Sequence, residues 1–409
     1  MRILIDQQFH PGHHYQYVNH LLPALVEAGE VVVATTAEGQ ASREFESFLA
    51  PFADRVRFEP ILPPASPWVP MSERWRVHRD FREAVTRLRP DYILIPSGDA
   101  QATLMAGYRL AGMGSAPGRL PCEIGIHLGS GAPAAGLKTR VRDQLNGLNL
   151  SLSGVRRVHF VNFLFFERIA RLAPSRAFSV MPHPVLPAPP MEKAASRRLL
   201  GIPEDGRYIG LAASIDSRKA VLEFLTAFRA VAGPGERALL AGYINNTHWD
   251  TITGKFGDLV ANGRLCVIRR FLSQTEYQAA LSALDVVCTP YPRFSGLSST
   301  LLEGVAAGRP ILADDFGWSA EVVRRFRLGW TCDVLNQGQF NSAVRKALDG
   351  ADEYRRSDGA ERLLAFHTVQ NFIDHWMLGV DRALGRPARS VKTWEWVSRG
   401  EESRTTSAR

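Results

Sequence analysis

The sequence lacks any apolar run of about 18 residues, the length that a membrane-spanning helix requires. It has only four cysteines, and they lie far apart in apolar surroundings, at positions 122, 266, 288 and 332. This spacing excludes a disulfide framework and a zinc site, and predicts reduced thiols in the core of a cytoplasmic protein. The opening residues MRILIDQQFH contain no long apolar segment of the kind found in signal peptides, and they predict a short strand instead.

The sequence also lacks a dense block of one charge. Lys and Arg number 49 against 41 Asp and Glu, which gives a net charge of +8 spread along the chain. This balance favours an anionic partner such as a phosphorylated small molecule, and it allows peripheral contact with the anionic inner face of a membrane. Nucleic acid is not an expected partner, because the sequence contains no recognisable nucleic-acid-binding module.

Short β-rich runs alternate with amphipathic stretches over most of the 409 residues, a length sufficient for two domains. Runs such as YILI and VVVA are apolar throughout, as in parallel strands covered on both faces. We therefore expect an α/β protein with two doubly wound Rossmann-like domains that face a cleft. The predicted strands are 2–6, 30–36, 55–60, 91–96, 122–127, 157–162, 177–182, 208–214, 236–244, 264–270, 284–290, 310–314 and 329–334.

A cluster of prolines near the middle of the chain interrupts this alternation and predicts a boundary between domains. The expected division is a first domain at 1–183, a Pro-rich hinge with a short helix at 184–206 and a second domain at 207–365. A last amphipathic helix is expected at 366–385, and a polar, partly disordered tail at 386–409. The Trp-Glu-Trp segment of the tail is expected to pack on the body of the protein, the alternative being contact with a membrane surface.

Two segments of the second half combine features that suit a nucleotide. Arg218 and Lys219 precede a helix, and a Gly/Ser-rich loop opens another helix that carries Glu303. Exposed N–H groups at a helix start bind anions, and a carboxylate accepts hydrogen bonds from the neighbouring hydroxyls of a ribose. The same loop also fits ordinary helix capping, and Glu303 also fits a favourable interaction with the helix dipole. Both interpretations remain open at this point.

The segment SGLSSTLLEGVAAGRPILADDFGWSAEVV, within 290–323, resembles the donor-site signature of the retaining glycosyltransferases of family 4, which have the GT-B fold. Glu303 matches the second acid of that signature, Gly308 and Pro310 its Gly-x-Pro, and Glu321 its final Glu. Residues 211–228 resemble the family segment whose lysine meets the donor diphosphate, and Lys219 matches that lysine. Residues 122–131 resemble a first-domain strand that ends in a histidine beside the donor sugar, and His127 matches it.

The resemblance implies an enzyme that moves a sugar from a nucleotide-diphosphate sugar to an acceptor, with no metal and no further cofactor. It implies catalytic roles for His127 and Lys219, and an acceptor function for the first domain, to which the last helix would return. Together with the features of the two helix starts, it gives the expected donor-binding residues, which are Arg218, Ser295, Gly296, Ser298, Ser299, Thr300 and Glu303. The acceptor would be a glycan, a lipid or a small molecule.

The loop after the first strand, FHPGHHYQYVNH, would belong to the acceptor side, with Gly12 and His13 as candidate residues. Its histidines also suggest a metal site, but no Cys or acidic residue lies close by in the sequence, so we expect acceptor-site or surface histidines. For His127, a hydrogen-bonded core histidine is the alternative to a role at the site.

Two positions depart from the family pattern. Ser295 stands where the family has its first acid, and Ser214 stands where an arginine precedes the lysine. Three hypotheses therefore remain: a retaining glycosyltransferase, a catalytically impaired GT-B protein that binds nucleotide sugars or serves as a scaffold, and an epimerase acting on a nucleotide sugar.

Overall fold

The computed structural model describes residues 1–9, 14–64, 71–102, 121–127, 137–172, 175, 177–187 and 191–399. The chain forms two compact units. The N-terminal unit comprises Met1–Pro184 and Phe366–Arg409, and the C-terminal unit comprises Val185–Ala365. Within the described residues, no helix has the length and hydropathy of a membrane span.

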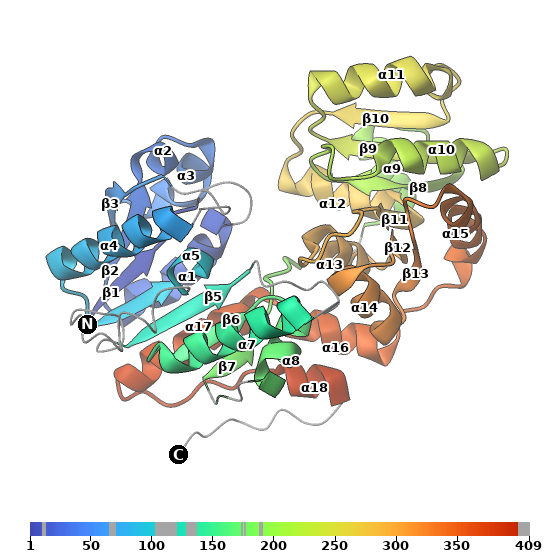
Figure 1. Cartoon of the computed structure of the whole chain (residues 1–409). Helices are drawn as coiled ribbons and strands as arrows, with labels where there is room; N and C mark the ends of the chain where they lie inside the picture. Colours follow the sequence, from blue (N-terminus) through green and yellow to red (C-terminus); the bar gives the residue numbers. More distant parts are fainter. Residues whose placement is uncertain are drawn as a thin grey trace. The chain divides into compact units, whose positions relative to one another are not determined.

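The N-terminal unit is built on a seven-stranded sheet in the order β3-β2-β1-β4-β5-β6-β7, in which every pairing is parallel (Figure 1). Helices connect the strands. Its elements are β1 (Arg2–Asp6), α1 (His14–Ala28), β2 (Glu30–Thr36), α2 (Ala37–Gln40), α3 (Arg43–Phe48), the 3-10 helix η1 (Ala50–Phe52), β3 (Arg57–Leu62), α4 (Met71–Leu88), β4 (Tyr92–Ile95), α5 (Asp99–Ala102), β5 (Cys122–Ile126), α7 (Leu137–Leu152), β6 (Arg157–Phe160), α8 (Phe163–Leu172), β7 (Phe178–Val180), α17 (Val369–Ala383) and α18 (Trp394–Arg399).

The C-terminal unit repeats this plan on a six-stranded parallel sheet in the order β10-β9-β8-β11-β12-β13. Its elements are α9 (Lys193–Leu200), β8 (Arg207–Ala212), α10 (Val221–Val231), β9 (Glu236–Gly242), α11 (Asn246–Ala261), β10 (Leu265–Arg269), α12 (Gln274–Ala283), β11 (Val286–Thr289), α13 (Ser299–Ala306), β12 (Ile311–Asp314), α14 (Gly317–Phe326), β13 (Gly329–Cys332), α15 (Gln337–Gly350), the 3-10 helix η2 (Ala351–Glu353) and α16 (Asp358–Phe366).

Each predicted strand is present in the structure, within a few residues of its expected bounds. β4, which contains YILI, is buried along its whole length, and so is the VVVA run of β2, as their continuous apolar sequences predicted. β5, β11 and β12 are also buried throughout. All four cysteines are free, and three of them are buried. The α/β class and the two Rossmann-like sheets are therefore confirmed.

The segment predicted as a hinge is mostly part of the C-terminal unit. Arg197, on α9, is 4% exposed and forms an ion pair of 2.9 Å with Asp285, at the start of β11. Its guanidinium also donates to the carbonyl oxygens of Ala283, Glu204 and Gly206. These bonds fix α9 on the second sheet, so residues 191–206 are a folded part of that unit and not a free linker.

Helix α17 packs in the N-terminal unit against buried polar groups. Glu123, on β5, accepts hydrogen bonds from the Tyr92 hydroxyl and from His159, both at 2.7 Å. A Cβ at Gly379 of α17 would overlap the Glu123 carboxylate and the Tyr92 hydroxyl, so only glycine permits this close approach. Beyond α17, Trp394 is buried and stacks on Phe163 with ring centroids 4.4 Å apart. The predicted packing of the tail on the body is thus confirmed for this tryptophan.

We predict that the N-terminal unit loses stability in mild acid. Burial lowers the pKa of His127 to about 4 and the pKa values of His367 and His375 to about 3. Below pH 6.5 these histidines become protonated in the unfolded chain but stay neutral in the folded protein. The free energy of unfolding is therefore highest above pH 6.5 and decreases as the pH falls toward 4. At pH 5 each of these histidines should lower the free energy of unfolding by about 2 kcal/mol.

Scanning calorimetry at pH 7.5 and pH 5 tests this prediction. The C-terminal unit contains a single histidine, His248, and serves as an internal reference. The transition of the N-terminal unit should shift downward more than that of the C-terminal unit, and His375→Gln should reduce the difference. Equal shifts of both transitions would contradict the prediction.

Candidate functional site

The strand order of the C-terminal sheet reverses beside β8, whose neighbours are β9 and β11. Parallel sheets bind ligands at such a reversal, outside the carboxyl ends of the strands, because the loops on its two sides diverge there. The loop after β8 and the loop after β11 are joined by a hydrogen bond of 2.9 Å from the Ala220 amide to the Pro290 carbonyl. A cavity of about 310 Å³ opens beside them, lined by Ile215, Ser217, Lys219, Ala220, Val221, Leu222, Glu223, Thr247, His248, Thr251, Ile252, Pro292 and Leu335.

Lys219 is the cationic side chain that lines this cavity, and it is largely buried. Its ammonium donates a hydrogen bond to the Ser214 carbonyl and lies 3.6 Å from the Asp216 carboxylate. It also lies 5.4 Å from the centre of the Tyr291 ring, at the end of β11. Burial lowers the pKa of Lys219, although the charge of Asp216 opposes this shift. The loop therefore holds one ammonium group at the edge of the sheet.

Asp216 organises this loop. Its carboxylate accepts hydrogen bonds from the Arg218 backbone amide at 2.9 Å and from the Arg218 guanidinium at 2.7 Å. Burial by itself would raise the pKa of Asp216, but these bonds and the charge of Lys219 hold the pKa at about 2. The Arg218 side chain is 79% exposed, and Arg218 is not among the residues that line the cavity. A ligand in the cavity would thus meet Lys219 before Arg218.

Helix α10 begins at the same cavity without a capping side chain. Its N-cap is Ala220, and no side chain of the described residues caps the helix, although the Val221 amide donates to the Lys219 carbonyl at 2.6 Å. The first residues of the helix, Val221 to Glu223, line the cavity together with Lys219. Uncapped N–H groups carry partial positive charge and attract anions. This helix start and Lys219 together form a positively polarised pocket that suits a phosphate or diphosphate group.

The Gly/Ser-rich loop before α13 is arranged differently from an open anion site. The Ser298 hydroxyl caps α13 by accepting a hydrogen bond from the Leu301 amide at 3.3 Å, and Ser298 is 4% exposed. Thr300 is also buried, whereas Ser295 and Gly296 lie at the partly exposed start of the loop. A Cβ at Gly296 would meet the Phe294 ring at 2.6 Å, which explains a glycine at this position. The loop and Ser299 provide an ordinary capped helix start.

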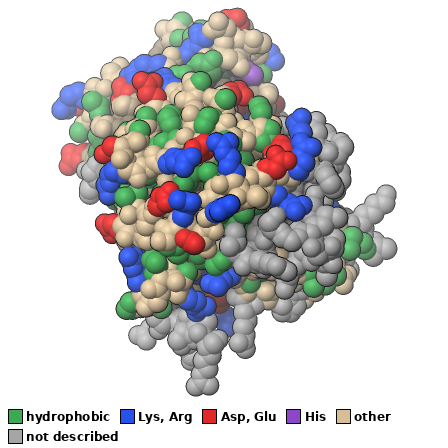
Figure 2. Space-filling model, turned by 90° about the vertical axis from the view of Figure 1, so that its left-hand side faces the viewer, with side chains coloured by type: hydrophobic (Ala, Val, Ile, Leu, Met, Phe, Trp, Pro, Cys, Tyr) green, Lys and Arg blue, Asp and Glu red, His purple; other side chains and the backbone are tan. Residues whose placement is uncertain are grey.

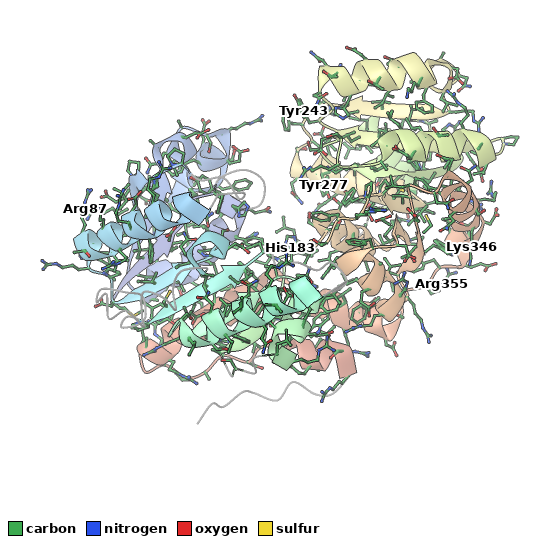
Figure 3. The ribbon with its side chains drawn as sticks, in the orientation of Figure 1. Arg87, His183, Tyr243, Tyr277, Lys346 and Arg355 are labelled. Carbon is green, nitrogen blue, oxygen red and sulfur yellow. The ribbon has the colours of Figure 1, made fainter. Side chains whose placement is uncertain are left out.

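Glu303, one turn into α13, is held by Tyr277 of α12, which is labelled in Figure 3. The Tyr277 hydroxyl donates a 2.6 Å hydrogen bond to one oxygen of the Glu303 carboxylate and lies 3.4 Å from the Thr300 hydroxyl. Burial raises the pKa of Glu303, and the bond from Tyr277 opposes that rise. The cavity on this side of Glu303 measures only about 10 Å³, which is room for about one water molecule. Contact between Glu303 and a ribose stays a prediction.

His127 lies in the N-terminal unit, directly after β5. Its ring Nε2 is 2.8 Å from the Pro96 carbonyl and must donate to it, and its backbone amide donates to Asp99 at 3.0 Å. The ring also packs beside His14 and Tyr17, at centroid distances of 5.6 and 5.5 Å. With its pKa lowered to about 4 by burial, His127 is neutral near pH 7.

Other polar groups gather at this edge of the N-terminal sheet, where β1, β4 and β5 end. His14 is hydrogen-bonded to Ser97, which follows β4, and His183, labelled in Figure 3, is bonded to Tyr17 of α1. The predicted acceptor-side residues Gly12 and His13 lie outside the described residues.

Asp216, Tyr277 and Tyr291 were not singled out from the sequence. Asp216 sits only three residues before Lys219, and this spacing is a local signal for the pair. Tyr277 is 26 residues from Glu303, and no sequence pattern links them. The absence of Ser, Thr, Asp or Asn directly before α10 was a usable sign that this helix start is uncapped.

Comparison with known proteins identifies the fold and finds a family model that matches part of the chain. Residues 192–362 match the family described as Glycosyl transferases group 1, a match that covers less than half of the chain. No curated protein matches the chain in sequence. The matched region contains the uncapped start of α10, Lys219 and Glu303.

Solved structures resemble the whole chain at low sequence identity. Sucrose-phosphate synthase from Thermosynechococcus elongatus has a TM-score of 0.67 at 16% identity, with 94% of this chain and 99% of that chain covered. A glycosyltransferase from Rickettsia africae has a TM-score of 0.65 at 11% identity, with 94% and 99% covered. HepE from Anabaena, solved in complex with UDP, has a TM-score of 0.63 at 13% identity, with 92% and 98% covered. The chain therefore has the GT-B fold.

We predict that Tyr277→Phe destabilises the C-terminal unit by about 1–3 kcal/mol at neutral pH, because a buried carboxylate loses its hydrogen bond. The pKa of Glu303 should rise further, so the loss should grow as the pH rises and Glu303 ionises. Urea denaturation at pH 5 and pH 7.5 measures both effects. Tyr243→Phe is the matched control, since Tyr243 of the same unit is 43% exposed and stacks its ring on Phe271. Equal stability of the two variants would refute the role given to Tyr277.

Proposed function

We propose that this protein is a glycosyltransferase that moves a sugar from a nucleotide-diphosphate sugar to an acceptor with retention of anomeric configuration. The match of residues 192–362 to a glycosyltransferase family and the GT-B fold support the reaction class. The resemblance of residues 290–323 to the family 4 signature supports retention. The net charge of +8 supports an anionic acceptor, whether a glycan, a lipid or a small molecule.

One observation carries the proposal: Lys219 and the uncapped start of α10 line a single cavity at the strand-order reversal. In the proposed reaction, the bond between the anomeric carbon and the donor diphosphate breaks, and negative charge develops on the diphosphate. An ammonium group and a helix N-terminus held near that charge stabilise it without reorganising. His127, being neutral, would serve as a hydrogen-bonding group and not as a proton donor. Glu303 would receive the ribose hydroxyls.

We predict that Lys219→Ala weakens UDP binding about tenfold to a hundredfold, the usual worth of a charge-assisted hydrogen bond. UDP is the suitable test ligand, because a structural neighbour was solved with it. Asp216→Asn should change affinity in the opposite direction, since it removes a negative charge that lies 3.6 Å from the same ammonium. Isothermal titration calorimetry measures both effects.

Lys255→Ala provides the control for this measurement. Lys255 is an exposed lysine of α11 in the same unit, and it is absent from the lining of the cavity. Unchanged UDP affinity in Lys219→Ala, or an equal loss of affinity in Lys255→Ala, would contradict the proposal that the cavity at Lys219 binds the donor diphosphate.

A second candidate is a GT-B protein that binds a nucleotide sugar without turnover. The observation that favours it is the engagement of Lys219 with Ser214 and Asp216, where the family pattern has an arginine at position 214. The nearby Asp216 carboxylate weakens the attraction of Lys219 for a diphosphate, compared with that of an unpaired lysine.

Turnover separates these candidates. For the enzyme we expect release of many equivalents of nucleoside diphosphate from one member of a panel of nucleotide sugars, with NMR of the glycoside product showing retained configuration. Release of no more than one equivalent across the panel would favour the binding protein. Conversion of the donor sugar to its epimer without an acceptor would indicate an epimerase instead.

A further inference from the structure

A second group of cavities lies in the N-terminal unit, at the edge of the sheet opposite to His127. One cavity of about 840 Å³ is lined by residues that precede β1, β4, β5 and β6, namely Met1, Asp91, Pro121 and Arg156. Another of about 550 Å³ lies along β7, the end of α17 and the chain around Trp394. The two share the lining residues Arg156, Arg157, Gly379 and Arg382, so they adjoin.

Four arginines line these adjoining cavities, and two of them have no side-chain partner among the described residues. In the part of the chain that the structure describes, the guanidinium groups of Arg156 and Arg382 make no hydrogen bond or ion pair. Arg157 donates a hydrogen bond of 3.4 Å to the His375 carbonyl. Arg386 donates a 3.3 Å bond to the Glu27 carbonyl and forms an ion pair of 3.7 Å with Asp381, which does not line the cavities. Figure 2, which views the molecule from the left-hand side of Figure 1, shows Lys and Arg side chains interspersed with acidic ones on this face.

The acidic groups that line the cavities do not neutralise these arginines. Glu123 is fully buried and is bonded to Tyr92 and His159. Asp91 accepts a 2.7 Å bond from the backbone amide of Arg2. Glu395 is exposed at the rim, on α18. Guanidinium groups that line a cavity suit an oxyanion such as phosphate, because their planar N–H groups bind two oxygens at once.

His375 supplies a second and independent feature. It is 2% exposed and lines the smaller cavity. Its Nε2 lies 3.0 Å from the Lys392 carbonyl and must donate to it, which leaves Nδ1 as an acceptor. Nδ1 is buried and has no hydrogen-bond partner in the described part of the chain. A buried acceptor without a donor costs free energy, so it marks a place where a hydroxyl group or a water molecule would bind.

We infer that the adjoining cavities form a binding site for a phosphorylated polyol, distinct from the proposed donor pocket. The phosphate would pair with Arg156 and Arg382, and a hydroxyl of the same ligand would donate to Nδ1 of His375. The chemistry is shared by a free sugar or glycerol phosphate and by the glycerophosphate headgroup of an anionic lipid. The inference does not depend on the proposed glycosyltransferase reaction, because no residue of the donor pocket takes part.

Calorimetric titration with glycerol 3-phosphate, inorganic phosphate and glycerol tests the inference on the full chain. We expect glycerol 3-phosphate to bind more tightly than inorganic phosphate, and glycerol alone to give no heat. The double variant Arg156→Gln/Arg382→Gln should weaken binding at least about tenfold, since two charge-assisted bonds are lost. Both arginines are exposed, so the double variant should melt at the same temperature as the wild type.

Arg55→Gln, an exposed arginine of the same unit outside both cavities, is the control and should bind normally. Co-sedimentation with phosphatidylglycerol vesicles, against phosphatidylcholine vesicles, distinguishes the headgroup from the free phosphate: sedimentation that the double variant abolishes would assign the site to lipid. No binding of glycerol 3-phosphate in either form, or equal binding by the double variant, would overturn the site. Equal affinity for inorganic phosphate and glycerol 3-phosphate would overturn the role of His375.

Discussion

The reversal of strand order beside one central strand of each sheet is the constraint on which the candidate sites depend. Helices that leave a parallel sheet in opposite directions separate the loops at its carboxyl edge and leave space between them. In the C-terminal unit this space receives Lys219 and the start of α10. In the N-terminal unit the corresponding edge collects His14, Ser97 and His127. Polar chemistry gathers there because the strands themselves are buried on both faces and have no room for it.

Local pairing balances most of the charges near these edges. Asp216 restrains Lys219, and Tyr277 satisfies Glu303. Such pairs lower the free-energy cost of burying a charged group. They also weaken the interaction that each group can make with a ligand. The N-terminal edge of the first sheet differs, because Arg156 and Arg382 face cavities without counter-ions among the described residues. An anion that binds there would displace no internal partner, whereas one at Lys219 competes with Asp216.

The fold could be predicted in detail, but the site only in part. Short β-rich runs that alternate with amphipathic stretches located the strands. The YILI and VVVA runs are apolar throughout because those residues are buried on both faces of the sheet. The Pro-rich segment suggested a hinge, yet α9 is fixed by an ion pair between Arg197 and Asp285, 88 residues apart, that no local pattern reveals. The loop before α13 suggested exposed N–H groups, but Ser298 caps that helix. The helix start without a side-chain cap belongs to α10, directly after Lys219.

The sequence by itself determined the α/β class, the two units, and the positions of Lys219 and Glu303 beside helix starts, because these follow from short-range periodicity and residue type. Only the tertiary structure decided what each side chain contacts. It paired Lys219 with Asp216, turned Glu303 toward Tyr277, made His127 neutral and gathered four arginines around a shared pair of cavities. The reason is that burial and pairing depend on segments far apart in the chain, whose approach is set by sheet order and helix packing and not by local sequence.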